Sequence, residues 1–403
     1  MLQDIVSWIL GFVDNVVYLL RFVKGKTAPK FFSNGWGDLD VAYKAQESFL
    51  TSLEQGDVSS ITLTDDDIDF SSSNVSSGGD NGNGITIREG LFDSPVAHML
   101  PPESKKCRFY IVEPKSTTTK KTITTNNNNS DGDDDLYVVM MPATGEQGKR
   151  ERLGLAKMLA TKYGWKSILI TAPLYGKRRP KSQRLFFLPK VSDALIQSIA
   201  IIQETTAVVR YYMTSSSKSS SNNSKVIMTG FSWGSAMSSL TTTSVLMSGG
   251  IDGSRIGHVP YVGSASPVVF VGGVLKNGID WDALLEDAQN RKLYPNVGTV
   301  SNVQSIMYDE LNKTQLAEFV TRYQAMLAKR ENNQKQNDNG KSFQPYPSVV
   351  RMFCMKNDGF IPPPFSQVYV NDIERLVQFN KDGNEKDGQS RTAASDAAST
   401  CDY

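Results

Sequence analysis

The sequence predicts an α/β protein with a mostly parallel sheet and helices on both faces. Three observations lead to this prediction: short apolar segments typical of buried strands, helical patterns between them, and polar runs without periodicity that separate them. Strands and helices that alternate at this spacing favour a parallel sheet, because each crossover places a helix against the sheet. At 403 residues the chain has room for one large domain or two small ones.

Apolar periodicity places the individual elements. The predicted strands are residues 109–112, 136–141, 167–171, 225–229, 260–264 and 349–355. The predicted helices between them are residues 150–163, 191–212 and 235–247. Only a polar loop separates the first two strands, so these two are candidates for an antiparallel hairpin.

The first 30 residues have the pattern of an amphipathic helix, with one narrow polar stripe. Asp4 and Asp14 lie in this stripe, and each would cost about 2.5 to 3.5 kcal/mol at the centre of a bilayer, so we do not expect a spanning helix. The segment ends in basic residues that suit an anionic membrane surface: Arg21, Lys24, Lys26 and Lys30. We therefore expect peripheral membrane contact through residues 1–30 and an intracellular, membrane-associated location. The secretory pathway, and a helix that only packs on the domain, stay open as alternatives.

Polar composition marks the parts that cannot form a core. Ser, Thr, Asn, Asp and Gly dominate four runs that we expect to be disordered: residues 54–84, 115–135, 214–224 and the tail 381–403. The main domain is then residues 31–380. Within it, residues 281–341 break the alternation with helical patterns, the clearest at residues 314–330. We expect this insertion to form a helical cap over the C-terminal edge of the sheet, where such folds bind ligands. The alternative is a helical excursion that contacts no pocket.

Composition excludes several classes of function. With 43 Lys and Arg against 42 Asp and Glu, the net charge is +1, so we expect no nucleic-acid partner. The three cysteines, Cys107, Cys354 and Cys401, lie far apart, which excludes a disulfide scaffold or a zinc knuckle. We expect no metal and no organic cofactor. Only two histidines occur, His98 and His258, so imidazole chemistry has two candidates.

The motif with the strongest chemical meaning is G-x-S-x-G at residues 230–234. An apolar strand ends at its first glycine and a helix opens after its second, which is the context of a nucleophilic serine on a sharp strand-to-helix turn. Ser232 would then lie at a helix N-terminus, where amide groups and the helix dipole stabilise an oxyanion. The alternative is an ordinary helix-capping serine.

The developing oxyanion needs donors, and the amide of the next residue, Trp233, is the first candidate. The small-residue turn after strand 136–141 offers two more, the amides of Thr144 and Gly145, although the turn is also explained without this role. A basic cluster after strand 167–171 contains Lys177, Arg178 and Arg179, with Lys181 and Arg184 following. We expect these side chains to bind an anionic head group of a substrate or a membrane, because the arginine fork matches phosphate. The alternative is a solvated basic loop.

Several further motifs, in order along the chain, resemble the α/β-hydrolase domain-containing protein 18 family. They are FFSNGWG at residues 31–37, SPVAH at 94–98, PATG at 142–145, APLYGKRRPK at 172–181, the serine motif, and GGVL at 272–275. The resemblance implies an α/β-hydrolase fold, Ser232 as nucleophile and Asp358 as the acid of the triad. It also implies an ester substrate, often a lipid ester. The residues agree about Asp358, which follows a late strand where this fold places the acid, although an Asp-Gly turn explains it too.

The chain departs from the family in one respect: no histidine follows Asp358. The family's triad histidine comes after one more strand, and polar sequence stands here in place of that last strand and helix. Both His258, early in its strand, and His98, in a Pro-bounded loop, are expected to be structural. Either the chain is truncated near residue 380, which we favour, or it is a pseudoenzyme.

We therefore expect a serine hydrolase for carboxylic or lipid esters that works near a membrane through an acyl-enzyme on Ser232 and is impaired in this chain. The alternative is a non-catalytic scaffold that binds a lipid or a protein.

Overall fold

A computed structural model gives the fold of most of the chain. It describes residues 29–71, 84–115, 135–214, 224–264, 271, 274–294, 297–334, 345–352, 367 and 369–376. Five sequence predictions lie wholly or largely outside these residues: the helix at 1–30, the loops at 115–135 and 214–224, Asp358, and the tail at 381–403. No helix within the described ranges is long and apolar enough to cross a membrane.

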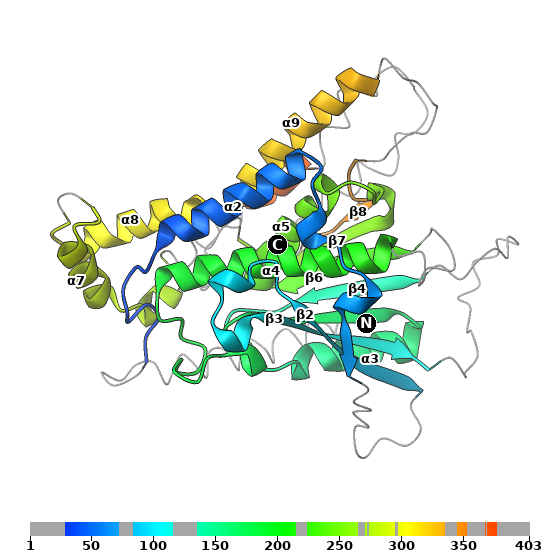
Figure 1. The fold of residues 1–403 in the computed structure, drawn as a ribbon, viewed down its shortest axis with the longest axis horizontal. Coiled ribbons are helices and arrows are strands. Elements are labelled where there is room, and N and C mark those ends of the chain that lie inside the picture. Colours follow the sequence, from blue (N-terminus) through cyan, green and yellow to red (C-terminus); the bar gives the residue numbers. More distant parts are fainter. Residues whose placement is uncertain are drawn as a thin grey trace, which may run out of the picture.

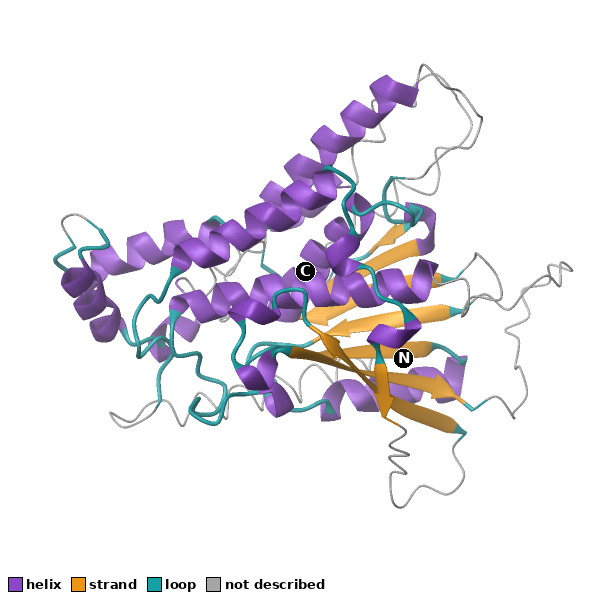
Figure 2. Cartoon of the chain, viewed as in Figure 1, coloured by secondary structure: helices purple, strands orange, loops and turns teal. Residues whose placement is uncertain are grey.

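The described residues form an eight-stranded mixed sheet in the order β1-β2-β3-β5-β4-β6-β7-β8. Its strands are β1 Asp69–Ser71, β2 Ile85–Asp93, β3 Lys106–Pro114, β4 Leu136–Met141, β5 Lys166–Thr171, β6 Lys225–Phe231, β7 Ile256–Tyr261 and β8 Val349–Val350. Strands β5, β4, β6, β7 and β8 are parallel to one another. β1 pairs antiparallel with β2, β2 with β3, and β3 with β5. Helices lie on both faces (Figure 2), so the predicted fold class is confirmed.

The predicted hairpin is wrong, because β4 does not pair with β3. Instead β3 pairs with β5, placing Phe109 opposite Ile170, and β4 lies between β5 and β6. The reason is burial: residues 137–141 of β4 are all buried, with Tyr137, Val139 and Met141 in one hydrophobic cluster and the residues between them in another. A strand that is apolar on both faces needs a neighbour on each side.

Part of the predicted disordered loop at residues 54–84 is ordered, which corrects that prediction. Residues 59–61 and 65–67 form short 3₁₀ turns that lead into β1. Ile61 and Ile68 are buried anchors, and the Asp67 carboxylate accepts a hydrogen bond of 2.7 Å from the amide of Thr64, the N-cap residue. The residues between these anchors are mostly polar and show no apolar periodicity, so the sequence did not predict the turns or the edge strand.

Three helices cover the sheet directly (Figure 1). α3, Arg150–Tyr163, lies on one face, and α4, Val191–Thr214, and α5, Trp233–Met247, lie on the other. All of α5 and most of α4 are buried, because a second helical layer covers them. α2, Leu39–Glu54, and α9, Leu316–Gln334, form this layer, shown in blue and gold in Figure 1.

The insertion is helical as predicted, with α7 at Trp281–Arg291, α8 at Val300–Asn312, and α9. We expect from the sequence that the insertion caps the C-terminal edge of the sheet, but its longest helix, α9, does not. α9 lies along α5 and α2 instead, where Arg322 forms an ion pair with Glu47 and donates a hydrogen bond of 2.6 Å to Glu318. The apolar side of α9 is therefore used in the helical layers.

A short segment at residues 31–37 joins α7 to the start of α4. The Trp36 indole donates to the Leu284 carbonyl over 3.0 Å, and the Ser192 amide donates to the Trp36 carbonyl over 2.9 Å. Gly35 has φ +81°, and a Cβ there would lie 2.3 Å from an Asp287 carboxylate oxygen, so only glycine fits this turn. One of the motifs that carry the family resemblance thus has a structural role.

His258 fastens β7 to α5. Its ring is fully buried, and Nε2 and Nδ1 lie 2.9 and 3.4 Å from the hydroxyls of Ser239 and Thr242. Ser239 also bonds the Tyr369 hydroxyl, which places the helical residues 369–376 against α5. This confirms the structural role expected for His258. Burial lowers its pKa to about 4.

The buried imidazole makes stability depend on pH. The unfolded chain binds a proton at His258 near its ordinary pKa of about 6.5, whereas the folded chain binds one only near 4. The contribution of the neutral His258 ring to stability should therefore be fully present above about pH 6.5. The free energy of unfolding should fall by about 3 kcal/mol as the pH drops towards 4. Urea unfolding of the wild type and of His258→Gln at several pH values measures this contribution.

The variant should lose the part of the pH dependence between these two values. His98→Gln is the matched control, because it removes the other histidine, which is exposed. A His258→Gln profile parallel to that of the wild type would show that another group controls acid unfolding.

Candidate active site

Ser232 lies on a sharp turn between β6 and α5. Its backbone has φ +56° and ψ −123°, a conformation that residues other than glycine rarely adopt. The Ser232 amide donates to the Tyr261 carbonyl over 3.0 Å, and its own carbonyl accepts from the Ser235 amide over 2.9 Å. The strained serine is therefore fixed from the neighbouring strand and from the first turn of the helix.

The two flanking glycines explain how such a tight turn forms. A Cβ at Gly230 would lie 2.2 Å from the Gly234 carbonyl oxygen, and a Cβ at Gly234 would lie 2.6 Å from that of Pro142. Backbone therefore packs on backbone at both positions, and no side chain fits. These contacts push Ser232 out at the end of β6, half-buried rather than in the core.

The amide of Trp233 opens α5 directly beside this serine. In the described part of the chain no hydrogen-bond acceptor meets this amide. Amides in the first turn of a helix point along its axis without a partner, and the helix dipole favours negative charge there. The arrangement can therefore stabilise an anion that develops on a group bound to Ser232.

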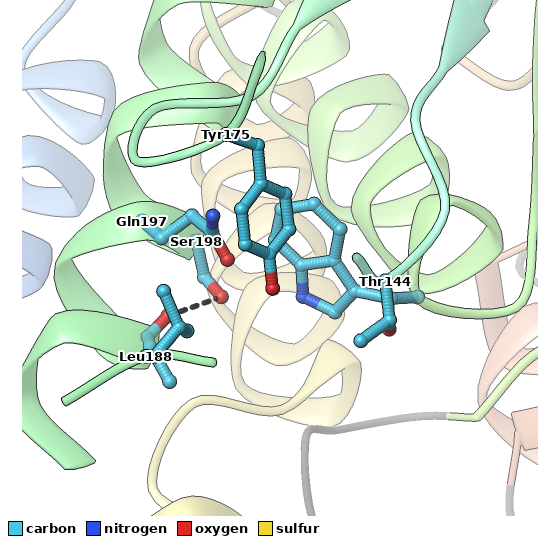
Figure 3. A pocket seen from close by; sticks show the side chains of 7 residues that line it. Thr144, Tyr175, Leu188, Gln197 and Ser198 are labelled. Atoms are coloured by element: carbon cyan, nitrogen blue, oxygen red, sulfur yellow. Dashed lines mark hydrogen bonds between the residues drawn. The ribbon is translucent and has the colours of Figure 1, made fainter. Parts of the chain in front are cut away.

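A small cavity lies beside the turn (Figure 3). Its volume is about 10 Å³, and it is lined by Thr144, Tyr175, Leu188, Ala194, Gln197, Ser198 and Trp233. This volume holds about one water-sized atom group. The structure thus brings together Thr144 and Trp233, two of the three residues predicted to supply oxyanion donors. Gly145 is not among the lining residues.

The turn that carries Thr144 is held by a buried ion pair that sequence reasoning missed. Gly145 has φ +78°, and the Glu146 amide closes the turn on the Ala143 carbonyl over 3.2 Å. The Glu146 carboxylate lies 2.7 Å from the Arg152 guanidinium, with both side chains buried. Because Arg152 comes from α3, the first helix after β4 fixes the turn. Only the six-residue spacing between the two charges hinted at this pair.

Arg178 corrects the predicted head-group cluster. Its side chain is 1% exposed and forms two hydrogen bonds to Glu204 of α4, of 2.7 and 2.6 Å. It also donates to the carbonyls of Thr171 and Ser104. A guanidinium with these partners is not available to a ligand, so Arg178 is structural. The sequence could not show this, because its partner lies 26 positions away.

The other two residues of that cluster are accessible. The Lys177 side chain is 67% exposed and lies 3.7 Å from a Glu89 carboxylate oxygen. Arg179 is half-buried and donates to the Gln147 side chain over 3.2 Å. A further lysine, Lys149, lies over the ring of Tyr110, and burial lowers its pKa to about 8. The region is therefore cationic but already partly paired.

Neither histidine reaches Ser232. His258 faces α5 from the middle of β7, and His98 is exposed on a turn after β2, which lies four strands from β6 in the sheet. Asp358, the predicted acid, lies outside the described residues. Among the residues described, no three His, Cys, Asp or Glu side chains gather in a way that would hold a metal ion.

Adding a single methyl group at Gly234 tests the geometry of the turn. Gly234→Ala should destabilise the fold by about 3 kcal/mol or more, because the new Cβ meets the Pro142 carbonyl oxygen at 2.6 Å. Thermal and urea unfolding measure the loss. Gly154→Ala in α3 is the matched control: nothing lies within 4 Å of its Cβ, so it should stabilise the helix by about 0.5–1 kcal/mol. Equal stability of the two variants would contradict the close packing.

Comparison with known proteins gives a family match and distant structural likenesses. The model of the family described as alpha/beta hydrolase domain containing 18 matches residues 29–374. An acetyl xylan esterase from Paenibacillus sp. R4 is similar at 10% identity and a TM-score of 0.43, over 85% of this chain and 86% of that one. Acetyl xylan esterase 1 from Thermoanaerobacterium sp. is similar at 12% identity and a TM-score of 0.43, over the same shares. The match to the family model includes both the serine turn and the Thr144 turn, and the chain belongs to the alpha/beta hydrolase domain containing 18 family.

Proposed function

We propose that the protein is a serine hydrolase that cleaves carboxylic esters, lipid esters among them, through an acyl-enzyme on Ser232. The observation that carries this proposal is the backbone of Ser232 at φ +56°, held between two glycines that no side chain can replace. Strain of this kind persists only where the surroundings enforce it, and it is concentrated at reactive sites. A serine that merely capped a helix would not need a strained backbone.

The residues support a simple acylation step. The Ser232 hydroxyl oxygen attacks the ester carbonyl, its proton passes to a base, and the carbonyl oxygen becomes an oxyanion. The amides of Trp233 and Thr144 are the donors that we propose for this oxyanion. The oxyanion then collapses, the alcohol leaves with a proton, and water later releases the acid from Ser232. In the same proposal, Asp358 orients the imidazole that acts as base.

That imidazole is missing from the sequence after Asp358, and among the described residues His258 bonds α5 while His98 lies on a turn after β2. Loss of the triad histidine lowers kcat by up to about a millionfold in serine proteases, while the oxyanion donors and binding retain some rate. We therefore propose that turnover by this chain is slow. The same observation favours a second candidate function, a non-catalytic scaffold that binds a lipid or protein partner.

Chemical rescue separates the two functions. A serine-reactive fluorophosphonate should label the full chain slowly, and added imidazole should speed the labelling because it supplies the missing base. The matched variant Ser232→Ala should show no labelling with or without imidazole. Intact-protein mass spectrometry measures the extent, and the modified peptide should contain Ser232.

Two results would reject the enzyme. One is an absence of labelling in the wild type at every imidazole concentration, which favours the scaffold. The other is equal labelling in Ser232→Ala, which places the reactive group elsewhere. Imidazole that accelerates the wild type alone supports the proposed acyl-enzyme.

We also propose that the substrate or its surface carries an anionic group that Lys177 and Arg179 bind. Both cationic groups follow β5 at the edge that carries Ser232, and their present partners, Glu89 and Gln147, leave Lys177 mostly exposed. The two cationic side chains lie within reach of a ligand that also approaches the Thr144 turn, because Gln147, the partner of Arg179, belongs to the loop after that turn.

Charge reversal tests this group. Lys177→Glu/Arg179→Glu should weaken binding to phosphatidylcholine vesicles that contain phosphatidylglycerol by about 10- to 30-fold, at roughly 1 kcal/mol for each lost cation near the surface. Vesicle flotation gives the bound fraction. Lys44→Glu/Lys329→Glu, at exposed positions of α2 and α9, makes the same change of net charge and should bind nearly as well as the wild type. Equal weakening in both variants would mean that only net charge matters.

A further inference from the structure

Tyr175 contributes a hydroxyl to the cavity beside Ser232, and no step described so far uses it. The tyrosine follows β5 and is 1% exposed, so it is almost completely enclosed. It lines the cavity together with Thr144 and Trp233, the residues whose amides we propose as donors to the oxyanion. In Figure 3 its hydroxyl points into the group of lining side chains, on the side of Gln197 and Ser198. The cavity has the size of about one oxygen-centred group.

The oxygen of this hydroxyl is already used as an acceptor. Burial raises the pKa of Tyr175, while hydrogen bonds to its oxygen from the Gly145 amide and the Gln197 side chain act in the opposite direction. A phenol oxygen has two lone pairs and one proton. With donors directed at the oxygen, the proton is what the hydroxyl still offers, and among the described residues no hydrogen bond donated by this hydroxyl is found. An enclosed donor without an acceptor is suited to an acceptor that arrives with a ligand.

The loop that carries Tyr175 is rigid enough for such a role. Gln197 donates to the Pro173 carbonyl over 2.6 Å, and the Leu174 amide donates to the Ser104 hydroxyl over 2.9 Å. Gln183 donates to the Leu174 carbonyl over 3.0 Å. Leu174 itself has φ +64°. A strained backbone whose neighbours are all hydrogen-bonded in the interior holds the next side chain in one place, as an electrostatic catalyst requires.

We propose that Tyr175 is a catalytic residue whose hydroxyl donates a hydrogen bond to the oxyanion formed on Ser232, alongside the amides of Trp233 and Thr144. This inference rests on the proposed function. It also reassigns Gly145: its amide acts on the Tyr175 oxygen, aligning the hydroxyl, and does not bind the oxyanion directly. Gln197 is then a positioning residue, because it acts on the reaction through Tyr175.

Tyr175→Phe tests the hydroxyl with little change of shape. Phosphonylation of Ser232 should become about 100-fold slower, the size of effect seen when one oxyanion donor is removed. In reaction, the serine oxygen forms a bond to phosphorus, fluoride leaves, and the serine proton passes to added imidazole. The phosphonyl oxygen takes the place of the oxyanion. The maximal rate should fall while the concentration for half-maximal rate stays near that of the wild type, because the hydroxyl acts on the charged oxygen and not on the bound reagent.

Tyr211→Phe is the matched control. Tyr211 is equally buried, and its hydroxyl donates to Asp65 near the far end of α4. The control should lose stability without any change in the phosphonylation rate. Unfolding midpoints of both variants show whether a slower rate reflects a damaged fold.

The outcomes distinguish this inference from the proposed function. If the wild type and Tyr175→Phe react equally and Ser232→Ala does not react, the inference is wrong and the proposed function stands. If the wild type does not react at all, both are wrong. A crystal structure of the phosphonylated wild type decides the matter even if Tyr175→Phe does not fold. The phosphonyl oxygen should lie about 2.7–3.1 Å from the Tyr175 hydroxyl, and an oxygen that contacts only the Trp233 and Thr144 amides would overturn the inference.

Discussion

The close approach of backbone to backbone at Gly230 and Gly234 is the constraint on which the site depends. A methyl group at either position would collide with a carbonyl oxygen, of Gly234 in one case and of Pro142 in the other. Because α5 comes this near to the ends of β4 and β6, the chain has to turn within one residue, and Ser232 takes a strained backbone conformation with positive φ. The same approach brings the Trp233 amide close to the turn after β4. The positions of the proposed nucleophile and of the proposed oxyanion donors therefore have one common cause.

Local sequence patterns predicted the elements around the serine well, because these elements are buried and regular. α3 has the bounds that the periodicity indicates, and α5 begins two residues before the predicted start because the turn at Ser232 leads directly into the helix. β7 occupies residues 256–261 instead of the predicted 260–264. The predicted range missed the first four residues of the strand, where the buried His258 is satisfied by hydroxyls of α5.

Features missed by the sequence depend on partners that are distant along the chain. β2 contains Arg88, Glu89 and Gly90, which do not suggest a strand, yet Arg88 pairs with Glu113 of β3, and Arg108 of β3 pairs with Glu89. Cross-strand neutralisation makes a charged strand stable, and a single strand does not reveal its neighbour. Arg178 looked like a ligand-binding residue for the same reason, since nothing local indicated Glu204. Tyr175 was part of a recognised motif, but only the fold places its hydroxyl beside Thr144.

Two buried arginines explain why the loops around the cavity keep their shape. Arg152 of α3 donates to the Ile170 carbonyl over 2.9 Å, and Arg178 donates to the next carbonyl, that of Thr171, over 2.8 Å. The end of β5 thus accepts hydrogen bonds from an arginine on each face of the sheet. Each guanidinium is neutralised by a buried glutamate. One of these pairs holds the turn of Thr144, and the other holds the loop of Tyr175. A carbonyl left without a donor at the end of a buried strand would otherwise admit water. The two walls of the cavity beside Ser232 are therefore fixed to the same strand end, and their separation is set by the fold before any ligand binds.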